Sequence, residues 1–382
     1  MGGRRARRRV TVGAPPRVPF LDLLATYTEL RDELDGAASR VLGGGWYVLG
    51  AEVARFEEAW AAHTGTAHCV GVASGLDALH LALVAMGVGE GDEVVVPSNT
   101  YIATWLAITR AGAVVAPVEP DPRTSNIDPA RIEAAIGPRT RAILPVHLYG
   151  RPAEMDAIRD IAGRRGLLVL EDAAQAHGAR HRGAPVGGLG HAAAWSFYPS
   201  KNLGAFGDGG AVTTDDPAIA ARLRTLRNYG STAKYVNRER GFNSRLDELQ
   251  AALLSEKLAV LDEWNARRRA IAARYLDGLA GEPLALPADD PGHAWHVFAV
   301  HTPRRDALAA HLADQGIGTL VHYPIPPHLQ EASPDLGRGE GDLPTPERLA
   351  RETLSLPMGP HLRTGDAERV IAAVRGFLRA DG

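Results

Sequence analysis

The apolar residues of this chain fall into short runs separated by stretches with helical spacing. Before residue 173, the apolar runs have the length and content of buried strands, at 68–74, 93–98, 113–119, 141–149 and 167–172. Between them, the segments 75–87, 100–112 and 153–166 repeat apolar residues at the spacing of a helix. Such alternation of apolar strands with helices predicts an α/β fold with a mostly parallel central sheet and helices on both faces.

The pattern changes on either side of this region. Two amphipathic helices are expected at 22–42 and 51–63, before the first strand. Beyond residue 201, we expect a strand at 209–214, a long helix at 245–276, a strand at 293–302, a helix at 304–316 and a strand at 319–324. A chain of this length exceeds what one core usually fills. We therefore expect a basic, disordered tail at 1–17, a large domain at 18–250 and a small C-terminal α+β domain at 251–382.

Composition narrows the function classes. The 382 residues carry a formal net charge of −3, which gives no overall attraction to nucleic acid or membranes. The five arginines between Arg4 and Arg9 fit a frayed, solvated tail better than a nucleic-acid-binding arm. Cys69 is the only cysteine, which excludes disulfides within the chain. No apolar run reaches the ~18 residues of a membrane span, and no signal-peptide core follows the arginines. We expect a cytoplasmic protein with no metal site and no nucleic-acid or membrane partner.

Three short motifs carry candidate chemistry, and the first is an acidic pair. In LLVLEDAAQAHGA, Glu171 and Asp172 fall where an apolar strand runs out into a loop. Ligands of open α/β sheets bind beyond the carboxyl ends of the strands, so a carboxylate there can meet a cationic group of a ligand. A loop acid that caps the next helix explains this motif equally well.

The second and third motifs concern an anion site and a lysine. In SGLDALHLAL, Ser74 and Gly75 turn the chain into a helix, whose first N–H groups can bind an anion, although an empty loop is the default reading. In WSFYPSKNLGAFGDGG, Lys201 stands among aromatic residues and glycines. A desolvated lysine has a lowered pKa and attacks aldehydes, whereas a solvated loop lysine does not.

Taken together, the three motifs match the needs of one cofactor, pyridoxal phosphate. Lys201 can bind its aldehyde, and the helix start at Ser74 and Gly75 can bind its phosphate. Asp172 can keep the pyridine nitrogen protonated, so that the ring withdraws electrons from a substrate carbon. The combination favours a pyridoxal-phosphate enzyme in which Lys201 points inward to form an imine.

The same segments resemble the DegT/DnrJ/StrS family of sugar aminotransferases. The motifs EDAAQAHGA, SFYPSKNLG and GDGGAVTT carry the resemblance, which extends over nearly the whole chain outside the arginine-rich tail. It implies the fold type I architecture of the aspartate aminotransferase superfamily, with pyridoxal or pyridoxamine phosphate as the cofactor.

The resemblance also implies roles for individual residues. Lys201 is the implied Schiff-base lysine, Asp172 pairs with the pyridine nitrogen, and Gln175 approaches the phenolic oxygen of the ring. The other implied cofactor contacts are Ser74, Gly75 and Ser196 at the phosphate, Tyr101 on the ring face, and Asn243, which reaches the phosphate of the neighbouring subunit in a homodimer. Candidate contacts to the sugar or nucleotide are His322, Tyr323, Asn228 and Tyr229, for which packing at a domain seam or a solvated loop is an equal alternative.

Further segments bear on the substrate. PSNTYIATWLA, PVHLYGRPAEMD, RNYGSTAKY and VHYPIPPHLQ look most like enzymes that act on nucleotide-linked 3-keto-6-deoxysugars. The resemblance implies transfer of an amino group from L-glutamate to C3 of a TDP-linked sugar, in amino-sugar or antibiotic biosynthesis. The same chemistry at C4 of a 4-keto sugar, or on a cyclitol ketone, stays open. Some relatives that act as dehydratases replace the lysine with histidine, so Lys201 favours transamination.

Two other classes of function are disfavoured. A nicotinamide-dependent reductase would need a G-x-G-x-x-G turn after an early strand, and GVASGLDALHLAL lacks that spacing. A sensor or regulator built on the same fold would not need the full set of Lys201, Asp172, Gln175 and Ser196.

Overall fold

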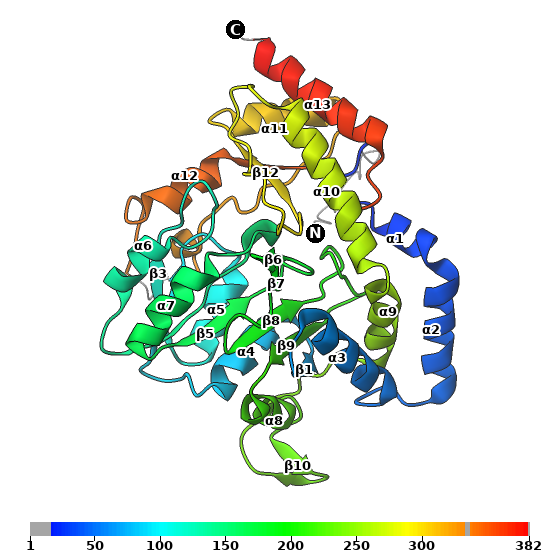
Figure 1. Cartoon of the computed structure of the whole chain (residues 1–382), viewed down its shortest axis with the longest axis vertical. Coiled ribbons are helices and arrows are strands. Elements are labelled where there is room, and N and C mark those ends of the chain that lie inside the picture. The colour runs from blue at the N-terminus through cyan, green and yellow to red at the C-terminus, as the bar shows by residue number, and fades with distance from the viewer. Residues whose placement is uncertain (1–16, 333–336, 381–382) are drawn as a thin grey trace, which may run out of the picture.

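A seven-stranded sheet forms the centre of the computed structural model, which describes residues 17–332 and 337–380 (Figure 1). Of the predicted basic tail, residues 1–16 lie outside this range. In sheet order, the strands are β1 (His68–Val72), β9 (Gly210–Thr214), β8 (Ala192–Ser196), β5 (Leu168–Asp172), β4 (Thr140–Ile143), β2 (Glu93–Pro97) and β3 (Val114–Val118). β9 is antiparallel to both neighbours, while β8, β5, β4, β2 and β3 pair in parallel. The mostly parallel sheet predicted from the sequence is confirmed.

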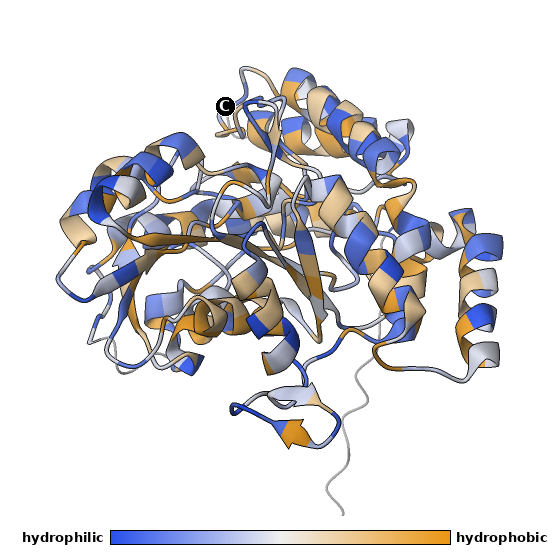
Figure 2. Ribbon diagram, turned by 60° about the horizontal axis from the view of Figure 1, so that its bottom comes forward, coloured by the Kyte–Doolittle hydropathy of each residue, from blue (hydrophilic) through white to orange (hydrophobic). Residues whose placement is uncertain are grey.

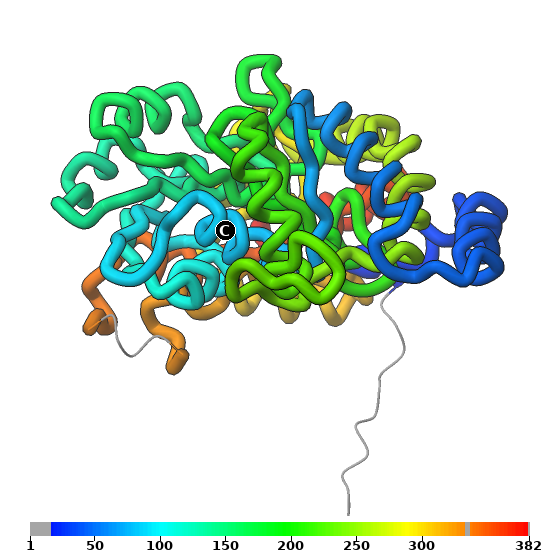
Figure 3. The backbone as a smooth tube through the Cα atoms, turned by 90° about the horizontal axis from the view of Figure 1, so that it is seen from below, coloured from blue at the N-terminus to red at the C-terminus, as the bar shows by residue number. Residues whose placement is uncertain are grey.

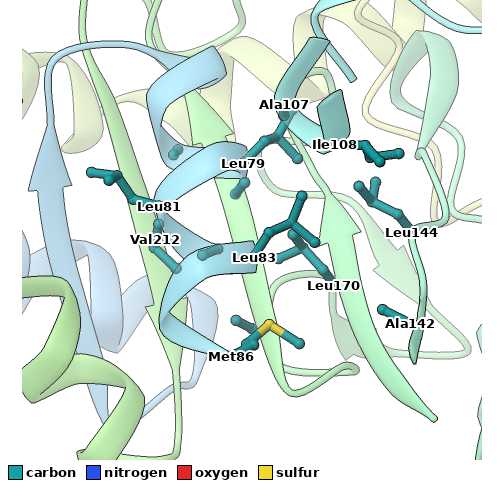
Figure 4. Packing of buried hydrophobic residues seen from close by; sticks show 14 of the residues in the cluster. Leu79, Leu81, Leu83, Met86, Ala107, Ile108, Ala142, Leu144, Leu170 and Val212 are labelled. Atoms are coloured by element: carbon teal, nitrogen blue, oxygen red, sulfur yellow. The ribbon is translucent and has the colours of Figure 1, made fainter. Parts of the chain in front are cut away.

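Helices cover both faces of this sheet because its strands are apolar on both sides. Val94 and Val96 of β2 face one core, while Val95 between them faces the other. The first face is covered by α4 (Gly75–Ala85), α5 (Ile102–Arg110) and α8 (Pro217–Leu226), and the second by α3 (Ala51–Thr64), α7 (Met155–Arg165) and α9 (Glu248–Leu258). Figure 2 shows the apolar strands between these helices, and Figure 4 shows Leu79 and Leu83 of α4 against Leu170 of β5.

A second core lies above one end of the sheet and is built mainly from the last third of the chain. It contains α10 (Leu261–Gly278), β12 (Phe298–His301), α11 (Arg305–Asp314), β13 (Thr353–Leu356) and α13 (Thr364–Arg379), with α12 (Pro344–Glu352) beside it. Val18 also packs in this core, and its N–H donates to the carbonyl of Gly316 at 3.0 Å. The division at residues 250 and 251 therefore stays a prediction, with the N-terminal segment crossing to the second core.

The remaining elements are short or peripheral. They are α1 (Leu23–Glu29), α2 (Arg31–Gly44), α6 (Pro129–Ile132), the 3₁₀ turns η1 (Glu133–Ala135), η2 (Leu148–Gly150) and η3 (Pro327–Leu329), and the two-stranded pairs β6 (Arg180–His181) with β7 (Ala184–Pro185) and β10 (Ser231–Ala233) with β11 (Val236–Asn237). Figure 3 shows α1 and α2 at one edge of the molecule, opposite α6 and α7. The β10–β11 hairpin projects from the body below α8.

Both long predicted helices are broken. The segment 22–42 divides at Leu30 into α1 and α2, and 245–276 divides at residues 259–260 into α9 and α10. Each second helix begins with two acidic residues, Asp32 and Glu33 or Asp262 and Glu263, which stabilise the positive end of a helix dipole. The apolar spacing continues across a tight break, so periodicity alone did not reveal it.

Some predicted strands are wrong or too long, and β8, β13 and the short strands β6, β7, β10 and β11 were not predicted. β8 has the sequence AAAWS, and alanine is depleted in strands, so its pattern does not indicate one. Within 319–324, Leu320 bridges to Ser355, but the segment otherwise leaves the sheet and carries His322 and Tyr323 toward the cavity described below. The predicted strand 293–302 shortens to β12, and α8, α12 and α13 were not predicted.

Candidate active site

A cavity of about 530 Å³ opens at the carboxyl edge of the parallel strands. Most of the site residues predicted from the sequence line it: Ser74, Gly75, Tyr101, Asp172, Gln175, Ser196, Lys201, His322 and Tyr323. They come from the segments after β1, β2, β5 and β8 and from the loop that enters from the second core. The fold therefore brings together residues that are almost 250 positions apart in the chain.

One end of the cavity is formed by the start of helix α4. The Oγ of Ser74 caps α4 by accepting the Asp77 N–H at 3.2 Å, and the following N–H groups of this helix start lie at the cavity wall. A Cβ on Gly75 would lie 2.5 Å from the Cβ of Ser196, and one on Gly210 would lie 2.3 Å from the carbonyl oxygen of Ser74. Glycine at both positions lets α4 begin directly against β8 and β9, beside the Ser196 hydroxyl.

Lys201 follows β8 and lines the middle of the cavity. Its backbone N–H donates to the carbonyl of Tyr198 at 2.8 Å, which closes a turn after the strand. Burial lowers the pKa of the Lys201 amine from 10.5 to about 8, and the negative charge of Asp172 offsets part of that shift. About a tenth of the amine is therefore unprotonated, and nucleophilic, at pH 7, far more than for an ordinary lysine.

This pKa predicts how an aldehyde reacts with the protein. The rate at which cofactor-free protein captures added pyridoxal phosphate should rise with pH through a midpoint of about 8, because the unprotonated amine of Lys201 is the nucleophile. Stopped-flow absorbance at a series of pH values measures this midpoint. A midpoint near 10.5, the ordinary lysine value, would contradict the buried setting of Lys201.

The two neighbouring carboxylates have separate surroundings because successive strand residues point to opposite faces. Asp172 lines the cavity, where its Oδ2 accepts the Thr104 hydroxyl at 2.9 Å and its Oδ1 accepts the Ala174 N–H at 3.2 Å. Burial raises the pKa of Asp172, while the hydrogen bonds from Thr104 and Ala174 and the charge of Lys201 act in the opposite direction. Asp172 is therefore the carboxylate available to a ligand.

Glu171 instead anchors a loop. Its carboxylate accepts three backbone N–H groups, from Gly187 at 3.2 Å and from Leu189 and Gly190 at 2.8 Å. His147 accepts the Ala153 N–H on Nδ1 at 3.0 Å, so its Nε2 carries the proton and donates to Glu171 at 3.0 Å. Both side chains are fully buried, and neither lines the cavity, so the acidic pair has one ligand-facing member and one structural member.

The loop from the second core is tied to the cavity through Gln175. The Gln175 Oε1 accepts the Tyr149 N–H at 2.6 Å, and its Nε2 donates to the hydroxyl of Tyr323 at 2.9 Å. The Tyr149 hydroxyl donates to the carbonyl of His322. Tyr101 is about half exposed, and its ring centroid lies 5.2 Å from that of Tyr323 at an angle of 38°. Two aromatic rings thus flank the cavity mouth.

The last three predicted residues lie elsewhere. Asn228, Tyr229 and Asn243 do not line this cavity. Asn228 and Asn243 form an isolated antiparallel bridge at the base of the β10–β11 hairpin. The guanidinium of Arg245 donates to Asn228 at 3.0 Å and lies 5.4 Å from the ring centre of the exposed Tyr229. Within one chain, these residues belong to a surface segment.

Other residues at the site were not predicted. Thr104 donates a hydrogen bond to Asp172 and orients it. Two further residues, Asp208 and His296, line the cavity, and Asn202 supports the turn after Lys201. The one available signal was the helical spacing of Thr104 from Tyr101, which puts both at the start of α5. His177, in contrast, packs among Trp60, Trp195 and Phe197 outside the cavity, and burial lowers its pKa to about 3.

Two features, a metal-binding cluster and a membrane-spanning helix, are absent from the described residues. Over residues 17–332 and 337–380, no group of three or more His, Cys, Asp or Glu side chains is placed to hold a metal ion. In the same part of the chain, no helix combines the length and the apolar content needed to cross a membrane.

Comparisons with known proteins identify the family of the chain. A model of the DegT/DnrJ/EryC1/StrS aminotransferase family matches residues 28–375. The chain is 58% identical to the dTDP-3-amino-3,4,6-trideoxy-alpha-D-glucose transaminase of Streptomyces venezuelae, over 94% of this chain and 96% of the relative. It is also 58% identical to the erythromycin biosynthesis sensory transduction protein EryC1 of Saccharopolyspora erythraea, over 94% and 99%.

A solved structure matches closely as well. The crystal structure of S. venezuelae DesV in complex with a ketimine intermediate superposes with a TM-score of 0.94 at 57% identity, covering 96% of this chain and 99% of DesV. This confirms the α/β fold type I architecture that the sequence motifs implied. The chain belongs to the DegT/DnrJ/EryC1/StrS aminotransferase family.

Proposed function

We propose that this protein is a pyridoxal-phosphate-dependent aminotransferase that moves an amino group from L-glutamate to C3 of a TDP-linked 3-keto-6-deoxyhexose. The observation that carries the proposal is one cavity in which Lys201, the Asp172 carboxylate and the anion-binding start of α4 meet. The full-length similarity to a transaminase named for a 3-amino sugar supports the choice of carbon. The product would enter amino-sugar or antibiotic biosynthesis.

The residues present fit the cofactor. The crowding that only glycine permits at positions 75 and 210 leaves a cradle of hydroxyl and N–H donors, which suits a phosphate. Asp172 would hold the pyridine nitrogen, Gln175 the phenolic oxygen and Tyr101 the ring face, with Lys201 at the aldehyde carbon. When bound, pyridoxal phosphate supplies an electron-withdrawing ring that stabilises negative charge on the reacting carbon.

The protein supplies proton transfer and orientation. With a pKa of about 8, the Lys201 Nζ can both accept and return a proton at the reacting carbon near neutral pH. Asp172, oriented by Thr104, would keep a proton on the ring nitrogen of the bound cofactor. Tyr323 is oriented by Gln175 and, with His322, lies where a sugar would enter. Because burial raises the pKa of Tyr323, its hydroxyl stays protonated and can donate a hydrogen bond to a sugar oxygen.

The alternatives differ in substrate or in class. A 4-keto sugar or a cyclitol ketone would use the same residues, because most residues that line the cavity are assigned to the cofactor and few to the sugar. A relative with 58% identity is named as a sensory transduction protein, so a regulatory role is the competing class. A regulator would not need a lysine of lowered pKa facing a carboxylate, and this favours an enzyme.

The proposal includes a cytoplasmic homodimer with shared active sites. Asn243 lies on the surface, away from the cavity of its own chain, next to the projecting β10–β11 hairpin. In the dimer, Asn243 of each chain reaches the phosphate bound by the other. Asn228 and Tyr229 of the same segment would face the nucleotide there.

Mixing two inactive chains tests this sharing. At limiting pyridoxal phosphate, Lys201→Ala and Asn243→Ala homodimers should each be weakly active. Refolded together in equal amounts, they should regain about a quarter of wild-type turnover, because half the dimers are mixed and each contains one intact site. No recovery on mixing, with mixed dimers verified by mass spectrometry, would place Asn243 and Lys201 in the same chain's site or rule out a role for Asn243.

The substrate test uses the half-reaction with a sugar. Protein converted to its pyridoxamine form with L-glutamate is offered the TDP-linked 3-keto and 4-keto 6-deoxyhexoses separately, and return of the yellow absorbance is followed. Return with the 3-keto sugar alone is the expected result. Return of the absorbance with the 4-keto sugar alone would support an aminotransferase but contradict the assignment of C3. If glutamate fails to remove the yellow absorbance, the assignment of glutamate as the amino donor is wrong.

A further inference from the structure

Two backbone segments carry the central residues of the cavity. One begins at Asp172, the last residue of β5, and continues through Gln175 and His177, and the other follows β8 and contains Lys201 and Asn202. Their separation decides how Asp172 and Lys201 face a ligand between them. Helix α10 passes behind both segments, outside the cavity lining.

Asn265 of α10 is hydrogen-bonded to both segments. It is 2% exposed, its Nδ2 donates to the carbonyl of His177 at 2.9 Å, and its Oδ1 accepts the Nδ2 of Asn202 at 2.9 Å. These two bonds fix which way the amide points, since its nitrogen meets an acceptor and its oxygen meets a donor. One buried side chain therefore bridges the residue after Lys201 and the loop that follows Asp172.

The chain makes room for this bridge at Gly178. Gly178 has a φ of +80°, and a Cβ there would lie 2.5 Å from the Asn265 Nδ2. A side chain at position 178 would therefore be strained and would push Asn265 away. Glycine is therefore required at position 178 because the Asn265 side chain packs against it.

The bridge continues into the cavity wall. Asn202 uses its second N–H to donate to the carbonyl of Ala294 at 2.8 Å, and its Oδ1 faces the Nδ1 of His296 at 3.2 Å. The oxygen can only accept, so Nδ1 of His296 carries the ring proton. Burial and the charges of Lys201 and Arg268 hold the pKa of His296 well below its usual range, so the ring is neutral. His296 lines the cavity beside Lys201.

We propose that Asn265 is a positioning residue that sets the placement of Lys201 relative to Asp172 by tying together the segments that carry them. The inference rests on the proposed function, because it concerns the amine that captures the cofactor. Asn265 touches neither substrate nor cofactor, and it acts through Asn202 and the carbonyl of His177. Its contribution is the geometry and the charge environment of the Lys201 amine.

The test compares Asn265→Leu with Tyr275→Phe in the full-length protein. Leucine has nearly the shape of asparagine but makes neither hydrogen bond. Tyr275 lies on the same helix, is fully buried and donates to the carbonyl of Pro357 at 2.9 Å, away from the cavity. The Tyr275→Phe variant therefore loses one buried hydrogen bond of α10 without changing the cavity. Thermal midpoints, the pH dependence of pyridoxal phosphate capture, and kcat and KM are measured for both variants.

Both variants should lose thermal stability, but only Asn265→Leu should change the lysine. In Asn265→Leu, the pH midpoint of pyridoxal phosphate capture should fall below the wild-type value of about 8. The reason is that a displaced Asp172 stabilises the cationic form of Lys201 less. The kcat should fall by about 10-fold to 100-fold with little change in KM for the sugar. A variant that keeps its circular dichroism spectrum but no longer retains the cofactor would support the proposal too, provided that Tyr275→Phe retains it.

Asn265→Leu with a wild-type capture midpoint and wild-type kcat would overturn the proposal and leave Asn265 a purely structural residue. If the leucine variant does not fold, Asn265→Ser carries the same test, since its shorter, uncharged side chain cannot bridge Asn202 and the carbonyl of His177. The capture measurement uses no sugar and no glutamate. A failure of the sugar assay in the wild-type protein would therefore count against the proposed function and not against Asn265.

Discussion

Replacing Lys201 with alanine is expected to lower kcat/KM for the keto sugar by about 10⁴-fold, because the variant loses both the amine that captures the aldehyde and the group that moves the proton. The fold should survive, since the side chain points into the cavity and leaves the core intact. The purified variant should also be colourless, or should release its cofactor on dialysis. Steady-state kinetics with glutamate and the sugar measure the loss.

The chain offers a matched control for this variant. It contains three lysines, Lys201, Lys234 and Lys257. Lys257 is also buried, and burial lowers its pKa to about 8, but its amine donates to the carbonyl of Gly204 at 2.6 Å and lies 3.9 Å from the ring centre of Phe206. Lys257→Met should lose stability and keep its yellow absorbance and most of its turnover. Equal losses of turnover in the two variants would contradict the assignment, because both lysines have a lowered pKa and only Lys201 lines the cavity.

Asp172→Ala is expected to lower kcat by about 10³-fold, the second-largest effect. Without the carboxylate, nothing keeps the ring nitrogen protonated, and the ring withdraws electrons less strongly. A cofactor analogue methylated on the pyridine nitrogen carries a permanent positive charge and should restore part of the rate in this variant. The variant's cavity also has space for the methyl group.

Glu171→Gln is the control for Asp172→Ala. Removing the Glu171 charge leaves three backbone N–H groups and His147 with a poorer partner, and this should lower the free energy of unfolding by about 3 kcal/mol. The folded fraction should keep most of its turnover, and the methylated analogue should not raise it. If the methylated analogue raises the turnover of Glu171→Gln, or fails to raise that of Asp172→Ala, the division of roles between the two acids is wrong.

Much of the fold could be predicted because its strands are buried on both faces. β2 and β5 read as continuous apolar runs, and the helices between them show a clear period. β8 could not be predicted, since its alanines have low strand propensity. The breaks at Leu30 and at residues 259–260 were missed because a tight turn between helices leaves the apolar period almost unchanged.

The site was predictable where a motif is contiguous and not where contacts come from distant segments. Lys201, Asp172 and Ser74 stand in motifs whose local chemistry already suggests a ligand. Thr104 and Asn265 act on those residues only through tertiary contacts, and no local pattern encodes such contacts. Asn243 is a different case, because its proposed target lies in another copy of the chain.

The most direct test of this account is to find the lysine that holds the cofactor. Protein purified with its cofactor is reduced with borohydride, digested, and mapped by mass spectrometry. The account predicts that the pyridoxal phosphate adduct is on the peptide containing Lys201 and is absent from the peptides of Lys234 and Lys257. An adduct on either of those lysines, or no adduct on any peptide of a protein that transfers amino groups, would contradict it.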